Sequence, residues 1–504
     1  MINLNYFLIF VFISFSTSDV ADKFIFVFTH FRNGATAPQD INDESLDLLK
    51  EKWDDPGELT GTGQRMQYVL GLRNRKRYIT DQKFLSEKFD AHELLIYSSN
   101  TNSTISSVSC QLQGLYPQIS EGGEILTKEQ EELSYPPVNV DYDYINNEIK
   151  NLNRSALPHR MMLAPIKMIN DKERKLLVYD IEGCTDKRDE VKKKNRENIP
   201  LLTEVVDNFN DKYGEKVNKL QGTDSKKYDI VFIEQFCDTF FSDNTDTRDL
   251  TEFKKTDINI EELENYCLDY ASKNFFYHNF GDEEKSLSHV ESSKIMKEFI
   301  HYMKQRIDAD IKEENIEEQY KDYSRPKMLM ISGYDSTVSS DEVFLMNAFG
   351  LNSSLYKFPK FASQMALEVT RKDDGQKKKD YSDYFVNYYL DDNNKFNVTA
   401  KELIEKLEKQ IWSDEQINQF CGWDNKDGNT NNNNGTNDGA NDGTDNGTIP
   451  KSKDKAKTAY KVLMSVFICT SAILLATTIV LGYKLFKKNS VSYPMVNQTT
   501  NTTM

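Results

Sequence analysis

The sequence has little positive charge for its length. Its 63 Lys and Arg residues are outnumbered by 80 Asp and Glu residues, which gives a formal net charge of −17 over 504 residues. Proteins that bind nucleic acid or anionic lipid surfaces do so mainly through clustered cations. We therefore expect no nucleic-acid partner and no docking of the folded part on anionic lipid.

Long apolar runs are also scarce, and only two stand out. The first, "YFLIFVFISF" (6–15), is too short to span a bilayer and is followed by the small residues Ser16, Thr17 and Ser18. This pattern predicts a secretory signal peptide over residues 1–18, with a buried first strand as the alternative. The second run (462–483) has no charge and is long enough to cross about 30 Å of hydrocarbon. It predicts a transmembrane helix.

A signal peptide and one later span together predict a single-pass type I membrane protein. More Lys residues precede the span than follow it, against the positive-inside rule, but long domains translocate largely regardless of flanking charge. Residues 424–461 begin with a tract of Asn, Asp, Gly and Thr that cannot bury a core, which predicts a flexible stalk. The tail, 484–504, would be cytosolic. Its Tyr493-Pro-Met-Val496 stretch has the Tyr-x-x-apolar pattern of a sorting motif, for which an adaptor complex is the possible partner.

Cysteine is rare as well, with six in the whole chain. One of them, Cys469, lies inside the predicted span, and the other five are Cys110, Cys184, Cys237, Cys267 and Cys421. Five luminal cysteines allow at most two intrachain disulfides and leave one thiol. Secretion would also expose N-x-[ST] sequons to glycosylation; the candidates are Asn102, Asn153, Asn352, Asn397, Asn434 and Asn446.

The folded region is then expected over residues 19–423. Apolar, strand-like segments occur near both of its ends: "FIFVF" (24–28), "ELLIYSS" (93–99), "KMLMISGYDS" (327–336), "FASQMALEV" (361–369) and "YFVNYYL" (384–390). Met66, Val69, Leu70 and Arg73 recur at helical spacing, and residues 185–310 are rich in helix formers and charge. This distribution predicts an α/β sandwich with a helical cap at about 185–310.

Several blocks, in the right order over roughly 400 residues, resemble the histidine acid phosphatases of the phosphoglycerate-mutase-like superfamily. The stretch "FRNGATAP" (31–38) resembles that family's Arg-His-Gly-x-Arg-x-Pro turn, and "LTGTGQRMQYVLGLRNRKRY" (59–78) its following helix. The segment 97–117 is similar to its RST-x-x-x-RT loop with a "GLYP" ending, and 328–350 to its strand ending in His-Asp. The resemblance implies a three-layer sandwich with a mostly parallel central sheet and a helical cap.

The same resemblance implies further properties. Cys184 and Cys421 stand where the family has a pair of cysteines, so they are expected to form a disulfide, with Cys237–Cys267 as a cap bridge and Cys110 as a buried free thiol. No metal or cofactor is expected. Members often form homodimers, and membrane-anchored lysosomal members carry a similar tail motif. The cell surface, endosome or lysosome is the expected location.

The catalytic positions of the family are mostly substituted here. The nucleophilic His corresponds to Asn33, whose amide nitrogen cannot attack phosphorus because its lone pair is delocalised. The His of the His-Asp pair corresponds to Tyr334, and two Arg positions correspond to Thr36 and Ser103. Arg32, a phosphate-clamp position, and Asp335, the proton donor to the leaving group, are retained. Each lost charge-assisted hydrogen bond is worth about 1.5–3 kcal/mol, so the site loses most of its phosphate affinity.

Two residues are candidates for a replacement nucleophile. His30 lies three positions before Asn33, so an extended strand directs the two side chains to opposite faces, and a hydrogen-bonded His behind the strand is expected instead. Tyr334 would need a base or cation to activate its phenol. Asp335 could also cap the helix that follows its strand, and Arg32 could pair with Asp335 and hold the loop together.

Two functions follow from these substitutions. The favoured one is a catalytically inactive, membrane-anchored glycoprotein of the histidine acid phosphatase family with a binding or structural role. The alternative is an active acid phosphatase that hydrolyses phosphate monoesters with an unrecognised nucleophile. The ligand of an inactive pocket is not readable from the residues.

Overall fold

A computed structural model describes the part of the chain that carries the sheet and its helices. The described residues are 22–38, 53, 55–117, 125–136, 138, 142–169, 184–198, 200–224, 226–247, 250, 253, 255–280, 287–312, 326–352 and 355–423. They all fall within the first of two compact units, 1–429, whereas the second, 430–504, lies outside them. Several predicted segments also lie outside the described residues: the signal peptide (1–18), the stalk (424–461), the span (462–483), the tail with Tyr493 and Val496, and the sequons Asn434 and Asn446.

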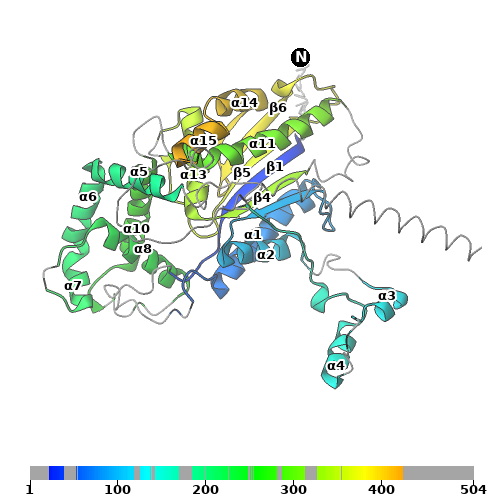
Figure 1. Ribbon diagram of the computed structural model, residues 1–504, viewed down its shortest axis with the longest axis horizontal. Helices are drawn as coiled ribbons and strands as arrows, with labels where there is room; N and C mark the ends of the chain where they lie inside the picture. The colour runs from blue at the N-terminus through cyan, green and yellow to red at the C-terminus, as the bar shows by residue number, and fades with distance from the viewer. Residues whose placement is uncertain are drawn as a thin grey trace, which may run out of the picture. The chain divides into compact units, whose positions relative to one another are not determined.

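A seven-stranded mixed sheet forms the centre of this unit (Figure 1). Its strands stand in the order β3-β2-β4-β1-β5-β6-β7. Their bounds are β1 Asp22–Arg32, β2 Leu94–Ser98, β3 Lys167–Met168, β4 Met328–Gly333, β5 Gln364–Lys372, β6 Tyr384–Leu390 and β7 Asn393–Thr399. The first four strands in this order pair in parallel, and the last three join as antiparallel neighbours. The sheet is thus less parallel than expected, because β5, β6 and β7 follow one another through short connections that reverse direction.

Helices cover both faces of the sheet, as the α/β prediction requires. The bounds are α1 Gly61–Arg75, α2 Asn102–Leu115, α3 Lys128–Leu133, α4 Asp143–Leu152, α5 Thr185–Asn198, α6 Pro200–Phe209, α7 Glu215–Gln221, α8 Ile230–Thr245, α10 Ile260–Asn274, α11 Leu287–Ile311, α13 Asp335–Phe349, α14 Ala400–Glu408 and α15 Asp414–Cys421. Helices α11, α13 and α14 share a core cluster with one face of the sheet, while α2 and the turn after α1 share a cluster with the other. The result is the three-layer arrangement expected from the sequence.

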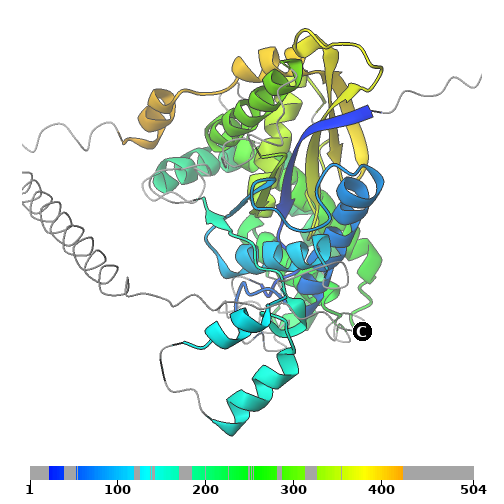
Figure 2. The same ribbon diagram turned by 90° about the vertical axis from the view of Figure 1, so that its right-hand side faces the viewer.

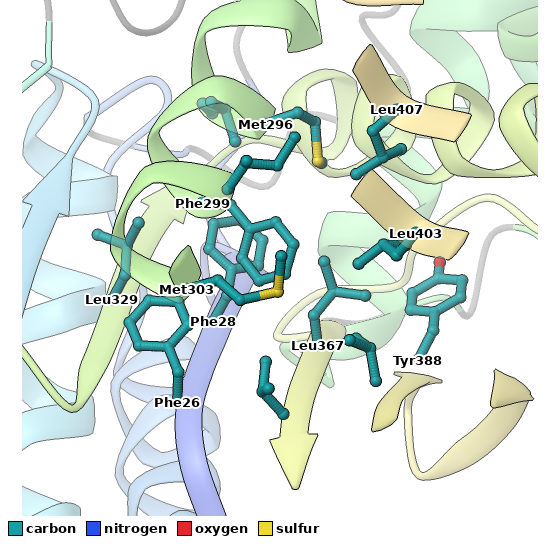
Figure 3. Packing of buried hydrophobic residues seen from close by; sticks show 14 of the residues in the cluster. Phe26, Phe28, Met296, Phe299, Met303, Leu329, Leu367, Tyr388, Leu403 and Leu407 are labelled. Carbon is teal, nitrogen blue, oxygen red and sulfur yellow. The ribbon is translucent and has the colours of Figure 1, made fainter. Parts of the chain in front are cut away.

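Strand β1 buries apolar side chains on both faces of the sheet. Its even-numbered residues Phe26 and Phe28 pack against Phe299 of α11, with ring centroids 6.0 and 5.4 Å apart (Figure 3). The odd-numbered Val27 and Phe31 belong to the cluster on the opposite face. This alternation buries β1 on both faces, as is typical of a central strand.

Helices α1 and α2 lie closer together than large side chains would allow. A Cβ atom added to Gly71 would come 2.0 Å from the Gln111 carbonyl oxygen, and one added to Gly114 would come 2.0 Å from the Tyr68 carbonyl oxygen. Glycine is therefore required at both positions. This close packing fixes α1 and α2 relative to each other.

The helical cap comprises α5, α6, α7, α8 and α10, seen in green in Figure 1. It has its own aromatic core, in which Phe209 contacts Tyr213, Phe232 and Phe236. One disulfide, Cys237–Cys267, joins α8 to α10 inside the cap. The other, Cys184–Cys421, joins the residue before α5 to the last residue of α15. The structure therefore contains both bridges that the family resemblance implied.

A short helical excursion, α3 and α4, leaves the sheet after α2 (Figure 2). At its base the Leu126 backbone N–H donates to the Arg154 carbonyl oxygen at 2.8 Å, and the Arg154 side chain returns a bond to Leu126 O. Glu131 pairs with Arg154 at 3.3 Å. These contacts hold the two ends of the excursion together.

The expectation that a transmembrane helix makes the bilayer a partner needs correction. Among the described residues no helix combines the length and the apolar character that crossing a membrane requires. The longest helix of the described part, α11, has 25 residues but carries charged side chains along its length. The segment that motivated the expectation, 462–483, is outside the described residues.

Candidate functional site

The candidate site lies at the carboxyl ends of three adjacent parallel strands. β1 ends at Arg32 and pairs in register with β4, which ends at Gly333. The next neighbour of β4 is β2, whose chain continues into α2 with Ser103 in its first turn. Crevices at this edge of an α/β sheet are where ligands usually bind. The topology thus brings together Arg32, Asn33, Ser103, Tyr334 and Asp335, which are far apart in sequence.

Asn33 is buried and fully engaged by the backbone. Its side-chain amide donates to the Gly34 carbonyl at 2.9 Å, and only 6% of the residue is exposed. Its backbone N–H donates to Gly333 O at 3.0 Å, and its carbonyl accepts from Ala362 N at 3.0 Å. The neighbouring Gly34 has no room for a side chain, since a Cβ there would meet Gly63 O at 2.3 Å. The position that the resemblance assigns to the nucleophile thus holds a buried carboxamide that is bonded to the backbone.

Arg32 is occupied by groups of the protein itself. Its Nη2 lies 3.0 Å from Asp335 Oδ2, and its Nη1 donates to the Pro359 carbonyl at 2.7 Å. The guanidinium also stands over the rings of Phe361 and Phe358, 4.2 and 5.2 Å from their centroids. These contacts use the charge and two of the donors that a phosphate clamp would offer.

Asp335 is the first residue of α13, directly after Tyr334. Its Oδ1 accepts from the Ser336 backbone N–H at 2.6 Å, and its other oxygen pairs with Arg32. A carboxylate in the first turn of a helix is stabilised by the helix dipole. The pair with Arg32 that the sequence suggested is present, but the N-cap residue of α13 is Tyr334 and not Asp335, so the capping alternative is wrong.

The remaining substituted positions carry no charge into the site. Thr36 forms an isolated backbone bridge with Leu59. Ser103 is buried, with its Oγ 3.4 Å from Thr101 Oγ1. The Tyr334 backbone N–H donates to Thr337 Oγ1 at 2.9 Å. Hydroxyl groups of this kind cannot replace the charge-assisted bonds that guanidinium groups make to phosphate.

His30 lies behind the strand, as its spacing from Asn33 predicts. It is fully buried, with Nδ1 2.8 Å from Asp341 Oδ2 and Nε2 3.1 Å from Thr337 Oγ1. Both ring nitrogens of His30 are thus hydrogen-bonded to residues of α13. This residue is excluded as a replacement nucleophile by its position.

Charged residues of the cap that the sequence reasoning missed also reach the site. Burial raises the pKa of Glu234 on α8, and the negative charge of Asp335 raises it further. The positive charges of Arg196 and Lys192 on α5 act in the opposite direction and lower this pKa. Arg196 Nη2 lies 3.0 Å from Glu234 Oε2. The spacing of Arg188, Lys192 and Arg196, four residues apart, is the sequence signal that could have found this cationic face of α5.

The described sequon residues are all exposed. Asn102 begins α2 beside the site, and its side chain donates to Glu58 Oε1 at 2.6 Å. Asn153, Asn352 and Asn397 are exposed elsewhere in the described part of the chain. Cys110 is the free cysteine, but it is half-buried rather than buried as expected, and burial raises the pKa of its thiol.

Comparison with known proteins identifies the family of the chain. The family profile of the histidine phosphatase superfamily (branch 2) matches residues 39–391, more than half of the chain. The chain therefore belongs to the histidine phosphatase superfamily, branch 2. The match begins directly after Pro38, so the turn that carries Asn33 lies outside it.

Relatives in this family bear the names of acid phosphatases. The chain is 37% identical over 82 residues to lysophosphatidic acid phosphatase type 6 of Homo sapiens, covering 16% of this chain and 19% of that protein. It is 33% identical over 102 residues to lysosomal acid phosphatase of Xenopus laevis, covering 20% and 22%. The matched regions thus span about a fifth of the length of these curated relatives. The phytase from Citrobacter braakii shares the fold, with a TM-score of 0.50, 11% identity and coverage of 80% and 99%.

Proposed function

We propose that this chain is a catalytically inactive member of the histidine acid phosphatases, with a binding or structural role. The observation that carries the proposal is Asn33 at the nucleophile position, with its amide bonded to Gly34 O. Phosphoryl transfer in this family is expected to begin with attack by an imidazole, and a carboxamide nitrogen is not nucleophilic. Asp335 would then have no leaving group to protonate.

The contacts of Arg32 support the same proposal. In a working site this side chain would bind the phosphate, whereas here Asp335 and Pro359 O hold it. The positions of Thr36, Ser103 and Tyr334 bring no cation that could take its place. A dianion entering the site would therefore have to displace a carboxylate from the retained arginine, which opposes binding.

The compartment we propose is the endolysosomal lumen or the cell surface. Two disulfides favour an oxidising, secretory environment. A relative is named lysosomal acid phosphatase, which is consistent with this location. In this proposal residues 19–423 are the folded domain, with its helical cap at about 185–310, and residues 1–18 direct it into the secretory pathway.

The proposal is tested by the activity of the purified full-length chain. We expect no hydrolysis of p-nitrophenyl phosphate above the buffer rate between pH 4 and 6. Turnover that is abolished by Tyr334→Phe would instead establish the alternative, an active acid phosphatase with an unrecognised nucleophile. Turnover that survives Tyr334→Phe would support the same alternative with another nucleophile, unless a mock purification shows an equal rate from a contaminating enzyme.

A further inference from the structure

Helix α1 is buried mainly through polar and small residues. The positions that it buries fully are Gly63, Gln67, Gly71 and Asn74. Of the apolar residues that indicated a helix, Met66 and Leu70 are half-buried, with Leu70 packed against the core cluster, and Val69 is 52% exposed. The outer, apolar side of α1 is thus only partly covered by the fold, and contiguous exposed apolar surface is typical of a binding site.

This outer face of α1 forms one wall of a hollow of ≈ 800 Å³. Met66, Val69 and Leu70 line it on the α1 side, and Ala362 lines it on the side of β5. Its lining includes none of the positions that correspond to the family's catalytic residues. Ala362 is nonetheless next to them, because its backbone N–H donates to the Asn33 carbonyl at 3.0 Å. The hollow is therefore a separate site beside the altered catalytic turn.

The rim of the hollow carries two arginines and two aspartates, Arg65, Arg73, Asp391 and Asp392, whose charges balance in number. Asp392 pairs with Arg73 at the far end of α1. Asp391 accepts from Ser363 Oγ at 2.8 Å and from the Gln364 backbone N–H at 2.9 Å, so both of its oxygens are engaged at the start of β5. Arg65 is exposed and has no ion-pair partner among the described residues. Its guanidinium is therefore available to an anionic group at the edge of an apolar surface.

We propose that this hollow binds a single-chain anionic amphiphile, with the chain along Met66, Val69 and Leu70 and the acidic head at Arg65. Its volume is within the range of about 300–1,000 Å³ that is typical of small-molecule sites. The apolar wall matches an alkyl chain, and the unpaired guanidinium matches a carboxylate or phosphate head.

This inference gives a ligand class to the binding role proposed above, and it rests on residues separate from the catalytic turn. The two proposals can therefore fail separately. A phosphatase assay decides whether the turn is inactive, and ligand binding decides whether the hollow is a site.

The test measures binding of 11-(dansylamino)undecanoic acid to the full-length chain by fluorescence. We expect saturable binding with a blue-shifted emission. Laurate and dodecyl phosphate, kept below their critical micelle concentrations, should compete, and comparing them separates a fatty-acid head from a phosphomonoester head. A chain shorter by two methylenes should compete about five- to tenfold less well, because less apolar surface is buried.

Two substitutions locate the site. Val69→Asp should weaken binding of the probe by at least about tenfold, because it places a carboxylate on the apolar wall. Arg65→Gln should weaken the binding of anionic ligands by about threefold, the effect of losing an exposed charge pair. The binding of the uncharged monolaurin should not change. The matched controls are Val231→Asp, at another exposed apolar position, and Lys128→Gln; neither should alter binding.

Three results would overturn the proposal. The first is an absence of saturable binding by the wild-type chain. The second is binding that Val69→Asp leaves unchanged, with the variant shown to be folded by circular dichroism. The third is a dimer, seen by sedimentation, that Val69→Asp dissociates while the probe fails to bind, since the occupant would then be a second copy.

Discussion

Arg32 and Asp335 contact each other through Nη2 and Oδ2 at 3.0 Å, across the ends of two neighbouring strands. By the resemblance to the family, both residues occupy positions that would face the substrate in an active phosphatase. In this chain the guanidinium is buried, and about a third of the aspartate side chain is exposed. The pair has therefore become an interaction within the protein, and its effect is expected on stability.

The contribution of the Arg32–Asp335 pair to stability can be measured by removing the carboxylate charge of Asp335. We expect Asp335→Asn to lower the free energy of unfolding by about 1–2 kcal/mol, because Arg32 is left buried without its counter-charge. Denaturant unfolding of the full-length chain provides the measurement. Asp392→Asn, whose partner Arg73 is more exposed, is the control and should change stability by less than about 0.5 kcal/mol. Equal effects in both variants would contradict a structural role for the Arg32–Asp335 pair.

Restoring the nucleophile alone should not restore an enzyme. We expect Asn33→His to leave p-nitrophenyl phosphate hydrolysis at background, since an imidazole without a clamp has no positioned phosphoryl group to attack. Activity should require Thr36→Arg, Ser103→Arg and Tyr334→His as well, with Asp335 then acting as the acid. Full activity in the single variant would show that the clamp is dispensable.

The control for this series concerns glycosylation and folding. Asn102 remains a sequon after Ser103→Arg, because the middle position of the motif accepts Arg. Each variant is therefore assayed before and after enzymatic deglycosylation. Circular dichroism is recorded in parallel, because Ser103 is buried and an Arg there must find room.

A buried carboxyl predicts that the protein is more stable in acid. Burial raises the pKa of Glu342 from 4.5 to about 8, and one of its oxygens lacks a hydrogen-bond partner among the described residues. Between these two values the folded state holds a proton that the unfolded state has released, so stability falls as the pH rises. The slope from this group is at most about 1.4 kcal/mol per pH unit.

Glu342→Gln should remove this part of the pH dependence. We expect the wild-type chain to lose more unfolding free energy between pH 5 and pH 7 than the variant, with a difference of about 1–3 kcal/mol. Denaturant titrations at the two pH values give the comparison. Glu405→Gln, at an exposed position of α14, should behave like the wild type. A variant with the same slope as the wild type would argue that Glu342 ionises normally.

The disulfide between Cys184 and Cys421 should dominate the effect of reduction. We expect Cys184→Ala to destabilise the chain by about 2–5 kcal/mol, because the bridge closes a long segment of the unfolded chain. Cys110→Ala should have a small effect, since its thiol is free. Peptide mapping without reduction provides a second readout, and a peptide joining Cys110 to Cys184 or to Cys421 would refute the assignment.

Local sequence patterns were sufficient to predict where the strands lie and toward which side of the sheet each side chain points. Odd spacing from Asn33 was enough to put His30 behind β1, because side chains alternate along any strand. The same kind of pattern identified α1 but could not show which face is buried. That face is set by the close approach of α2, which accepts only Gly71 and Gly114 at the contact. Helical spacing alone contains no information about such a neighbour.

The partners of Arg32 lie beyond the reach of sequence reasoning for a similar reason. Phe358, Pro359 and Phe361 come from the loop before β5, more than 300 residues along the chain. Their arrival at the end of β1 depends on β5 pairing antiparallel to it. The substitutions at the turn can be identified from the sequence. The contacts that occupy Arg32 can be identified only from the three-dimensional structure.

The bridge from Cys184 to Cys421 also determines what a protease does to the chain. It encloses the cap and the strand that ends before Asp335, a stretch of 237 residues. A single cut anywhere within this stretch leaves the two fragments covalently joined. Arg32 would then sit on one fragment and Asp335 on the other after a cut in the cap, still held in one particle. The protein can thus be nicked into two chains without coming apart, and its subunit pattern on a gel depends on whether a reductant is present.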